Sequence, residues 1–148
     1  MSNNISVRVF FINNKNQTLL IRRIESERRE PNKLILPGGR VEVQENIYNA
    51  IIREIKEELG LNCKEKEFEF IGKTTKRSYE VLEINYLLYR QFSNFSEIDL
   101  VPTTSKEIRS FHFLQPEFVL PEDYAFNELE EMTKYYLKAR NLLHIKID

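Results

Sequence analysis

The chain has 148 residues, and its 22 Lys and Arg side chains nearly balance 23 Asp and Glu side chains, for a formal net charge of −1. This length suits one domain, residues 1–148, with a sizeable core, and it leaves no room for a second domain. The near-zero charge excludes the basic field of a dedicated nucleic-acid or anionic-membrane binder, so any recognition of phosphate must be local. The sequence also has no run of about 20 apolar residues, the length that crosses a bilayer.

The single cysteine and the amino-terminal residues indicate a compartment. Cys63 has no second cysteine with which to form an internal disulfide. Residues 1–14 contain no basic leader, and Arg8 interrupts their short apolar stretch, unlike the pattern of a signal peptide. We therefore expect a reducing, cytoplasmic environment and no membrane partner.

The amino-terminal half predicts two strands, a loop, a glycine turn and a helix. Alternating apolar residues over 5–11 predict a strand, and the NNKN turn at 13–16 leads to a second strand at 19–21, both near the sheet centre. Dense charge and Pro31 predict an exposed loop over 22–33, before LILPGG at 34–39. From about Glu45 to Leu59 the apolar residues recur with helical period, and Gly60 suits the left-handed position after a helix.

The carboxyl-terminal half predicts three further strands and a second helix. Phe68 and Phe70, then the alternation over 81–89, predict two strands joined by a basic connection, KTTKRS, at 73–78. Residues 108–114 predict another short strand. After Pro121 the spacing of apolar residues predicts an amphipathic helix that packs on the sheet: Ala125, Leu129, Met132, Tyr136 and Ala139. The pattern is typical of an α/β fold in which a mixed sheet is sandwiched between helices.

Three glutamates lie at the edge of the first helix's apolar stripe. On a helical wheel this stripe faces the core and consists of Ile47, Ile51, Ile55 and Leu59. The same wheel places Glu54, Glu57 and Glu58 beside the stripe and not on the opposite, solvated face. An ionised carboxylate is costly to bury without a partner, and spacings of three and four bring these side chains together. The sequence therefore predicts a positive group among them.

The position of these glutamates along the helix favours a cation. They occupy the last turn, where the helix dipole already presents negative charge. Two unit charges about 5 to 6 Å apart repel by about 3 kcal/mol at an effective dielectric constant of about 20. A divalent cation reverses the sign of that interaction. Ligands that are all oxygen suit Mg²⁺, with Mn²⁺ as a substitute, and Mg²⁺ commonly bridges carboxylates to substrate phosphates.

Residues 39–61 carry a longer pattern around these glutamates. Aliphatic residues stand at Ile55 and Leu61, and the remaining positions of the pattern are Gly39, Glu45, Arg53, Glu54, Glu57, Glu58 and Gly60. With ordinary residue usage as background, the chance of this match in a given window is roughly 10⁻⁹. The pattern resembles the complete Nudix box. The resemblance implies the Nudix fold, in which a mixed sheet lies between helices, and the chemistry of the Nudix hydrolases.

The resemblance also implies roles for single residues. In Nudix enzymes the carboxylates that match Glu54, Glu57 and Glu58 bind metal together with the carbonyl that matches Gly38, and the glutamate that matches Glu45 is more often structural. The family often has an aromatic residue where this chain has Leu34, a departure that bears on the substrate and not on the metal.

Arg53 and the two glycines have expected roles from the residues themselves. Arg53 lies four positions before Glu57 and is expected to orient its carboxylate through a charge-assisted hydrogen bond. Gly38 and Gly39 permit close approach of the main chain, which brings a carbonyl next to the cation.

Charged residues outside the box leave alternatives open. Glu107 precedes a predicted strand, where many Nudix enzymes place a further glutamate that binds metal or acts as a general base. The other interpretation is a surface glutamate paired with Lys106 or Arg109. Two basic stretches either reach substrate phosphates or, as we favour, form solvated surface: Arg22, Arg23, Arg28 and Arg29, and Lys73, Lys76 and Arg77.

The remaining candidate side chains have structural interpretations. Three tyrosines could stack on a base, although core packing is favoured: Tyr79, Tyr86 and Tyr124. His112, His144 and Cys63 have no partner at the spacing of a metal site, a catalytic triad or an activated thiol. The run Glu128, Glu130 and Glu131 lies near the start of the second helix, where the dipole favours negative charge without a ligand.

We therefore expect a Mg²⁺-dependent enzyme that hydrolyses the diphosphate linkage of a nucleoside diphosphate joined to another group. Glu58 or Glu107 is the expected general base, with Glu54 as an alternative. The expected partner is a small nucleotide derivative, because the near-neutral charge suits a long RNA poorly, with a short 5′ end left open. The competing hypothesis is a noncatalytic module that senses a nucleotide in the same cleft. The substrate is set by loops 22–33, 73–79 and 92–106, and neither it nor the oligomeric state can be read from the sequence.

Overall fold

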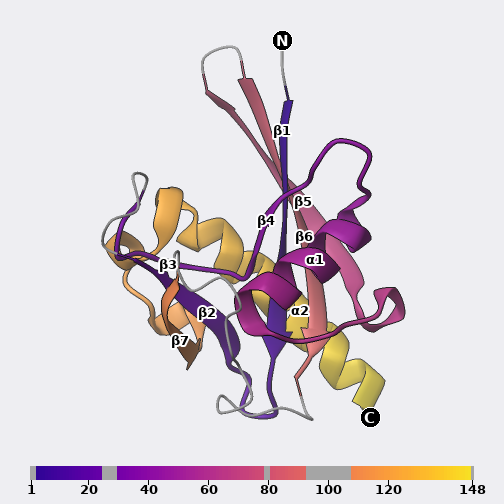
Figure 1. Ribbon diagram of the computed structural model, residues 1–148. Helices are drawn as coiled ribbons and strands as arrows, with labels where there is room; N and C mark the ends of the chain where they lie inside the picture. The colour runs from indigo at the N-terminus through magenta and orange to yellow at the C-terminus, as the bar shows by residue number, and fades with distance from the viewer. Residues whose placement is uncertain (1–2, 25–29, 79–80, 93–107, 148) are drawn as a thin grey trace.

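The computed structural model describes residues 3–24, 30–78, 81–92 and 108–147, with a mixed sheet between two helices (Figure 1). The strands are β1 (Asn3–Ile12), β2 (Thr18–Arg23), β3 (Leu34–Ile35), β4 (Gly38–Arg40), β5 (Glu69–Ser78), β6 (Val81–Gln91) and β7 (Ile108–Leu114). The helices are α1 (Ile47–Leu59) and α2 (Leu129–Ile147), and short 3₁₀ turns are η1 (Glu65–Glu67), η3 (Pro116–Phe118), η4 (Pro121–Asp123) and η5 (Ala125–Asn127).

Strand β1 lies at the centre of the sheet and determines where the glycine turn can sit. In the described residues the strand order is β3–β2–β1–β6–β5, with β4 paired to β1 and β7 to β2. β1 runs parallel to β6 along its whole length, whereas its antiparallel pairing with β2 is confined to Ile12 and Thr18. β4 occupies the vacated side of β1, where Arg8 pairs with Gly38 and Ser6 with Arg40. The separation of β1 from β2 therefore brings the glycine turn to the middle of the sheet.

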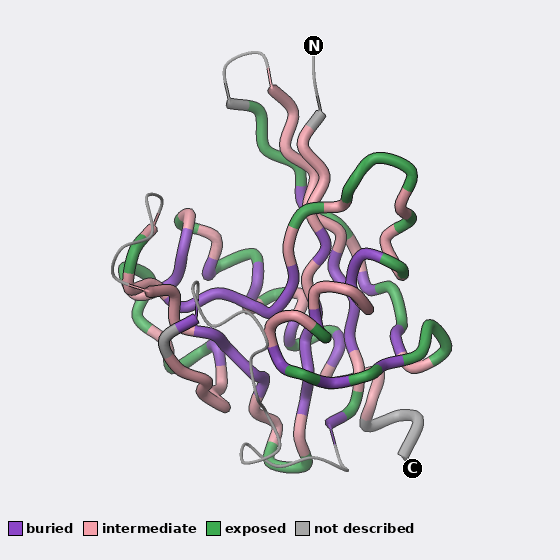
Figure 2. Tube along the Cα trace, in the orientation of Figure 1, coloured by how far each residue is buried: buried purple, intermediate pink, exposed green. Residues whose placement is uncertain are grey.

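The two faces of the sheet carry separate cores. Val7, Val9 and Phe11 of β1 point into the core under α1, and Phe10 and Ile12 point into the core under α2. Figure 2 shows buried residues gathered where the strands cross between the helices, whereas the outer end of the β5–β6 hairpin is exposed or half-buried. The predicted sandwich of a mixed sheet between helices is confirmed. No helix in the described ranges is both long and apolar enough to cross a membrane.

The capping residues Asn46 and Gly60 determine where helix α1 begins and ends. Asn46 is the N-cap, and its side chain accepts a hydrogen bond from the Asn49 N–H at 2.7 Å, so the helix starts two residues after the predicted Glu45. Gly60 adopts the predicted left-handed conformation, with φ of 72°, and its N–H donates to the Lys56 carbonyl. The acidic residues near the helix end therefore lie in its last two turns.

The sequence-based prediction was wrong for residues 73–78. The KTTKRS segment is not a connection, because β5 continues through it to Ser78 and pairs with β6 throughout. Thr74 and Thr75 are β-branched residues that suit a strand, and Lys76 lies opposite Glu83, so the cross-strand pair joins opposite charges. The second helix also starts later than predicted: α2 begins at Leu129, and Ala125 lies in the η5 turn that precedes it.

Candidate active site

The carboxyl-terminal end of α1 holds three glutamates at one corner of the molecule. Buried apolar residues of α1 fix the helix against the sheet: Ala50, Ile51, Ile55 and Leu59. Glu54 is 16% exposed, Glu57 is 43% exposed and Glu58 is half-buried, as expected for side chains at the edge of the apolar stripe. We call these three residues, with Gly38 and Gly39 of β4, the acidic corner.

The two glycines let the main chain of β4 meet the carboxylates. The Gly38 N–H donates a hydrogen bond to Glu58 Oε1 at 2.7 Å. Gly38 has φ of 142°, and a Cβ there would lie 2.0 Å from the Val7 carbonyl oxygen, so only glycine fits. A Cβ on Gly39 would lie 2.5 Å from Glu54 Cδ. Close approach of the glycine turn to the helix is thus confirmed, while the role of the Gly38 carbonyl as a metal ligand stays a prediction.

Arg53 organises the corner, although not through the partner that the sequence suggested. Its Nε and Nη2 donate to both carboxylate oxygens of Glu45 at 2.8 and 2.9 Å, and its Nη1 donates to Glu54 Oε1 at 2.9 Å. Nη2 also donates to the Arg40 carbonyl at 2.9 Å, which ties α1 to β4. The distance from Nη1 to Glu57 Oε2 is 3.6 Å, an ion pair longer than a hydrogen bond. Arg53 therefore orients Glu54 directly and Glu57 only electrostatically.

The pKa values of Glu45 and Glu54 are shifted in opposite directions. The Arg53 hydrogen bonds lower the pKa of Glu45 to about 2. Burial raises the pKa of Glu54 above its ordinary value, with Glu57 adding to the effect and Arg53 and Arg8 opposing it. Glu45 is thus a stably ionised partner of Arg53, whereas the charge on Glu54 is held at a cost in free energy.

The corner has the chemistry of a divalent-cation site but not a closed coordination shell. Among residues whose positions are described, no three His, Cys, Asp or Glu side chains surround a common point. The donors at the corner are nevertheless oxygens, as hard cations such as Mg²⁺ and Mn²⁺ require. Burial raises the pKa of Glu54 although Arg53 donates a hydrogen bond to it, so its present neighbours only partly offset the cost of burying its ionised form. A divalent cation fits this deficit, with side-chain rotation needed to complete its ligands.

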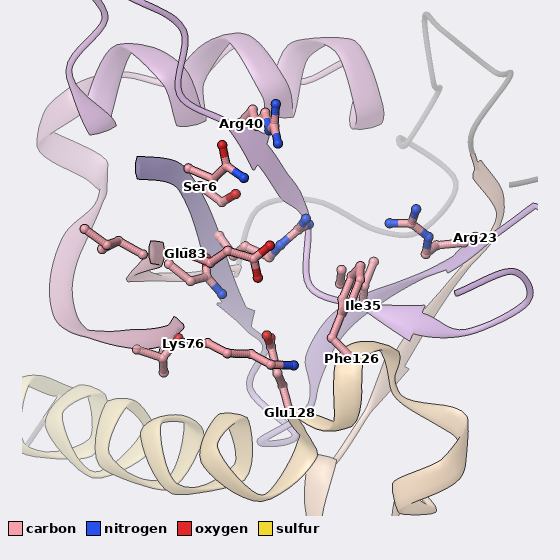
Figure 3. A pocket seen from close by; sticks show the side chains of 13 residues that line it. Ser6, Arg23, Ile35, Arg40, Lys76, Glu83, Phe126 and Glu128 are labelled. Carbon is pink, nitrogen blue, oxygen red and sulfur yellow. The ribbon is translucent and has the colours of Figure 1, made fainter. Parts of the chain in front are cut away.

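A polar cavity of about 230 Å³ lies beside the corner on the α2 side of the sheet (Figure 3). We call it the sheet pocket. Its floor consists of two rows of residues, and the members of each row are paired across adjacent strands. One row is Arg40, Ser6, Asn85 and Thr74, and the other is Asn4, Glu83 and Lys76. The pocket lies before the first residue of α2, where the helix does not cover the sheet. The strand residues are polar here, whereas further along the same strands the residues that α2 covers are apolar.

Phe126 and Glu128 form the α2 side of the sheet pocket. Phe126 has φ of 59°, a left-handed conformation unusual for an aromatic residue, and its N–H donates to Glu30 Oε1 at 3.0 Å. Arg23 Cζ lies 5.8 Å from the centre of the Phe126 ring. Burial raises the pKa of Glu128, the carboxylates of Glu131 and Glu83 add to this, and Arg8 and Lys76 oppose it.

Arg8 connects the sheet pocket to the acidic corner. Its Nη1 donates to the Leu36 carbonyl at 2.7 Å, and its side chain lines the pocket. Burial raises the pKa of both Glu54 and Glu128, and the same guanidinium opposes the rise in each. One cation therefore acts electrostatically on a carboxylate of the corner and on a carboxylate of the pocket.

Comparison with known proteins identifies the family. The NUDIX domain family matches residues 2–136. The chain belongs to this family. It is 35% identical over 57 residues to the 8-oxo-dGTP diphosphatase of Escherichia coli (strain K12), a match that covers 38% of this chain and 44% of that protein. It is 40% identical over 68 residues to the m7GpppN-mRNA hydrolase NUDT17 of Xenopus laevis, which covers 46% of this chain and 22% of that protein.

A solved structure extends the likeness to nearly the whole chain. The MutT protein from Methanosarcina mazei Go1 superposes with a TM-score of 0.71 at 25% identity, over 93% of this chain and 96% of that chain. The two relatives of known activity, by contrast, match over less than half of their own length. The Nudix fold and family are therefore established along the chain, and the sequence-based expectation of both is confirmed.

Several candidates outside the Nudix box now have positions. Arg23 and Lys76 line the sheet pocket, Arg23 half-buried and Lys76 exposed, so both interpretations of these two basic residues stay open. Arg22 instead pairs with Asp123 at 3.0 Å, away from the acidic corner. Lys73 and Arg77 are exposed. Arg28, Arg29, Tyr79 and Glu107 lie outside the described residues, and the role of Glu107 stays a prediction.

The other aromatic and thiol candidates are structural in this Nudix domain, as favoured. Tyr124 is buried, and its hydroxyl accepts a hydrogen bond from the Leu36 N–H at 3.3 Å. Tyr86 packs against the core under α1. Cys63 is buried with Arg90 Nη1 at 3.3 Å from its Sγ, and burial raises the pKa of its thiol. His112 contacts Ser110 through a 2.7 Å hydrogen bond.

The sequence analysis missed the sheet pocket, including Arg8, Glu83, Asn85 and Phe126. A signal for part of it was present: on β1 and β6 the residues facing α2 change from polar to apolar partway along each strand. Asn4, Ser6 and Arg8 precede Phe10 and Ile12, and Glu83 and Asn85 precede Leu87 and Tyr89. Such a switch indicates where the covering helix stops. Glu128 was interpreted only as a helix-dipole partner, whereas the structure places it on the pocket wall.

Proposed function

We propose that this protein hydrolyses the diphosphate linkage of a nucleoside diphosphate joined to another group, with Mg²⁺ as cofactor and Mn²⁺ as a substitute. The observation that carries the proposal is the acidic corner: three carboxylates on one helix edge, against a glycine strand, beside a pocket lined by arginines. Membership of the Nudix family supports the same reaction class.

The residues that would hold the cation are Glu54, Glu57 and Glu58, with the Gly38 carbonyl. When bound there, the cation neutralises negative charge on the diphosphate and makes water a stronger acid. The carboxylates are prepared for this task by their neighbours. Arg53 restricts Glu54 through a hydrogen bond, and the Gly38 N–H restricts Glu58.

Arg8 and Arg40 are the candidates for binding the substrate's phosphates. Both line the sheet pocket, and both belong to strands that meet the acidic corner at Gly38 and Gly39. Guanidinium groups suit phosphate oxygens because they offer several N–H donors in a fixed plane. A diphosphate held between them and the corner has its bridging oxygen close to the carboxylates, which is the orientation that hydrolysis needs.

Hydrolysis requires a base that takes a proton from the attacking water. The water oxygen forms a bond to one phosphorus, the bond from that phosphorus to the bridging oxygen breaks, and the second phosphate leaves with the bridging oxygen. We assign the proton to the Glu58 carboxylate, whose position the Gly38 N–H fixes. Glu54 is a weaker candidate because Arg53 already donates to it, and Glu107 is the alternative outside the described residues.

The names of two relatives favour a guanine nucleotide as substrate. One acts on 8-oxo-dGTP and the other on m7GpppN-mRNA, and both substrates contain a guanine base. Because those matches cover less than half of each relative, they support a substrate class and not a particular molecule. The partner we propose is therefore a small guanine nucleotide with a diphosphate linkage.

A substrate panel tests the proposal. Purified protein is incubated with Mg²⁺ and nucleoside triphosphates, nucleotide sugars, ADP-ribose, dinucleoside polyphosphates and short capped RNA, and products are separated by chromatography. Cleavage at a diphosphate linkage that stops on chelation supports the proposal. Binding without any product, for every compound and with either Mg²⁺ or Mn²⁺, would instead identify the noncatalytic sensing module.

A further inference from the structure

The sheet pocket contains a carboxylate, Glu128, to which the hydrolytic chemistry gives no task. We propose that the sheet pocket binds the base of the nucleotide and that Glu128 selects guanine by accepting two hydrogen bonds from adjacent N–H groups of its Watson–Crick edge. This inference rests on the proposed function for the ligand being a nucleotide. It adds the residue that determines which base is accepted.

The location of the sheet pocket suits the nucleoside end of a substrate whose phosphates lie at the acidic corner. Its volume of about 230 Å³ is near the lower end for small-molecule sites, about 300 Å³, as expected for one heterocycle. Arg40 lies on β4, the strand that carries Gly38 and Gly39 of the corner, whereas Phe126 and Glu128 lie toward α2 (Figure 3). A nucleotide can therefore span the site with its phosphates at one end and its base at the other.

Phe126 provides an aromatic surface for the base. Its left-handed backbone is disfavoured for a bulky side chain, and the hydrogen bond to Glu30 and the cation over its ring hold it in place. Strain that neighbouring residues maintain is typical of binding sites. Every base has an aromatic face, so stacking on such a ring does not depend on which base is present. Phe126 thus explains affinity but not selectivity.

Glu128 has the properties of a selective acceptor. Within the described residues no group donates a hydrogen bond to its carboxylate, although the side chain is half-buried. The charged groups around it are two cations, Arg8 and Lys76, and two anions, Glu83 and Glu131. The side-chain carbonyl oxygen of Asn85, on the pocket floor, is buried and likewise lacks a partner there. A ligand with several N–H donors would satisfy this region.

Guanine is the base whose edge matches a carboxylate. An ionised carboxylate only accepts hydrogen bonds, through two oxygens side by side. Guanine presents N1–H and N2–H next to each other, so both oxygens receive a donor. Adenine and cytosine each place an acceptor nitrogen beside their amino group, and uracil places its single N–H between two carbonyls, so each of these bases opposes a lone pair to the carboxylate. Substituents at N7 or C8 of guanine leave the matching edge intact.

Binding of nucleoside monophosphates tests this inference separately from catalysis, because they contain no diphosphate linkage. Isothermal titration with GMP, IMP and AMP is performed on the wild-type protein and on Glu128→Gln in the presence of Mg²⁺. IMP lacks only the N2 amino group of GMP. The wild-type protein should bind GMP tighter than IMP, and IMP tighter than AMP. Glu128→Gln replaces one acceptor oxygen with a donor, so GMP should bind about 10- to 100-fold more weakly, with the preference over AMP reduced by a similar factor.

Two further variants keep the result interpretable. Glu130→Gln makes the same change of charge on the exposed surface of α2, at a residue that is not among the charged groups around Glu128, and should preserve the order of affinities. Phe126→Leu should weaken all three ligands by similar factors, because stacking is not selective. If GMP, IMP and AMP bind wild-type protein equally, if GMP does not bind, or if Glu128→Gln retains the wild-type ratios, the inference is overturned. Loss of cleavage in the substrate panel with intact selective binding would instead overturn only the proposed function.

Discussion

The acidic corner and the sheet pocket are neighbours that the chain assembles in opposite ways. The corner is local: Gly38 and Glu58 are separated by 20 positions, and one helix and one turn place all of its residues. The pocket draws on strands β1 to β6 and on the η5 turn before α2, so it exists only once the sheet has its register. The local site leaves a fixed spacing that can be recognised in the sequence, whereas the pocket leaves only the change from polar to apolar residues along β1 and β6.

Replacing Glu58 should break the corner while sparing the pocket, and it has the largest expected effect. Glu58→Gln retains the shape of the side chain but removes the charge and the proton acceptor, so we expect kcat to fall by about 10²–10⁴-fold. The order of affinities for GMP, IMP and AMP should be unchanged, because Glu58 does not line the sheet pocket. The measurement is steady-state kinetics with the best substrate of the panel.

The matched control for this prediction is Glu65→Gln, an exposed glutamate in η1 that belongs neither to the acidic corner nor to the lining of the sheet pocket. It should leave kcat unchanged. Equal rates for Glu58→Gln and the wild-type protein would show that the corner does not carry the chemistry.

The two glycines of the corner should separate folding from function. Gly38→Ala places a Cβ 2.0 Å from the Val7 carbonyl in a conformation that alanine rarely adopts, so we expect a loss of about 3 kcal/mol in the free energy of unfolding. Gly39→Ala meets the movable end of Glu54 instead, so stability should change by less than about 1 kcal/mol while kcat falls by about 100-fold. Urea unfolding and kinetics on both variants give the comparison, and similar unfolding energies for the two would contradict it.

Removal of the metal should destabilise the corner and leave the pocket's base selectivity unchanged. A cation that binds only the folded protein stabilises it by about 2.7 kcal/mol at one hundred times its Kd. Thermal unfolding should therefore shift upward on addition of Mg²⁺ or Mn²⁺, and less so in Glu57→Gln. An identical shift in wild-type protein and Glu57→Gln would exclude that carboxylate as a ligand.

The smallest expected effect is the contribution of Glu45 to the stability of the folded protein, which should be lost at low pH. Because the folded-state pKa of Glu45 is about 2, below its ordinary value of 4.5, its ionised form stabilises the folded protein at neutral pH. That contribution is lost as pH falls from about 4.5 toward about 2. Glu45→Gln should be less stable at neutral pH and should lose less stability across this interval than the wild-type protein. Urea unfolding at several pH values measures both, and parallel pH curves for the two proteins would contradict the role of the Arg53–Glu45 pair.

The same contrast explains how far the sequence could be interpreted. Helical spacing placed Glu54, Glu57 and Glu58 at the edge of the buried stripe, because each helix position follows from its neighbours. It could not show that Arg53 donates hydrogen bonds to Glu45 and lies farther from Glu57, because these distances depend on where the side chains lie once the turn before the helix has folded. The extent of β5 was missed because only its pairing with β6 makes residues 73–78 a strand.

The central claim is that a divalent cation completes the acidic corner. A crystal structure of the protein with Mn²⁺ and a non-hydrolysable guanosine diphosphate derivative tests it most directly, because anomalous scattering locates the ion. We predict manganese bound by Glu54, Glu57 and Glu58 and in contact with the ligand's phosphates. Manganese bound elsewhere, with these three side chains still in their present contacts, would contradict the account.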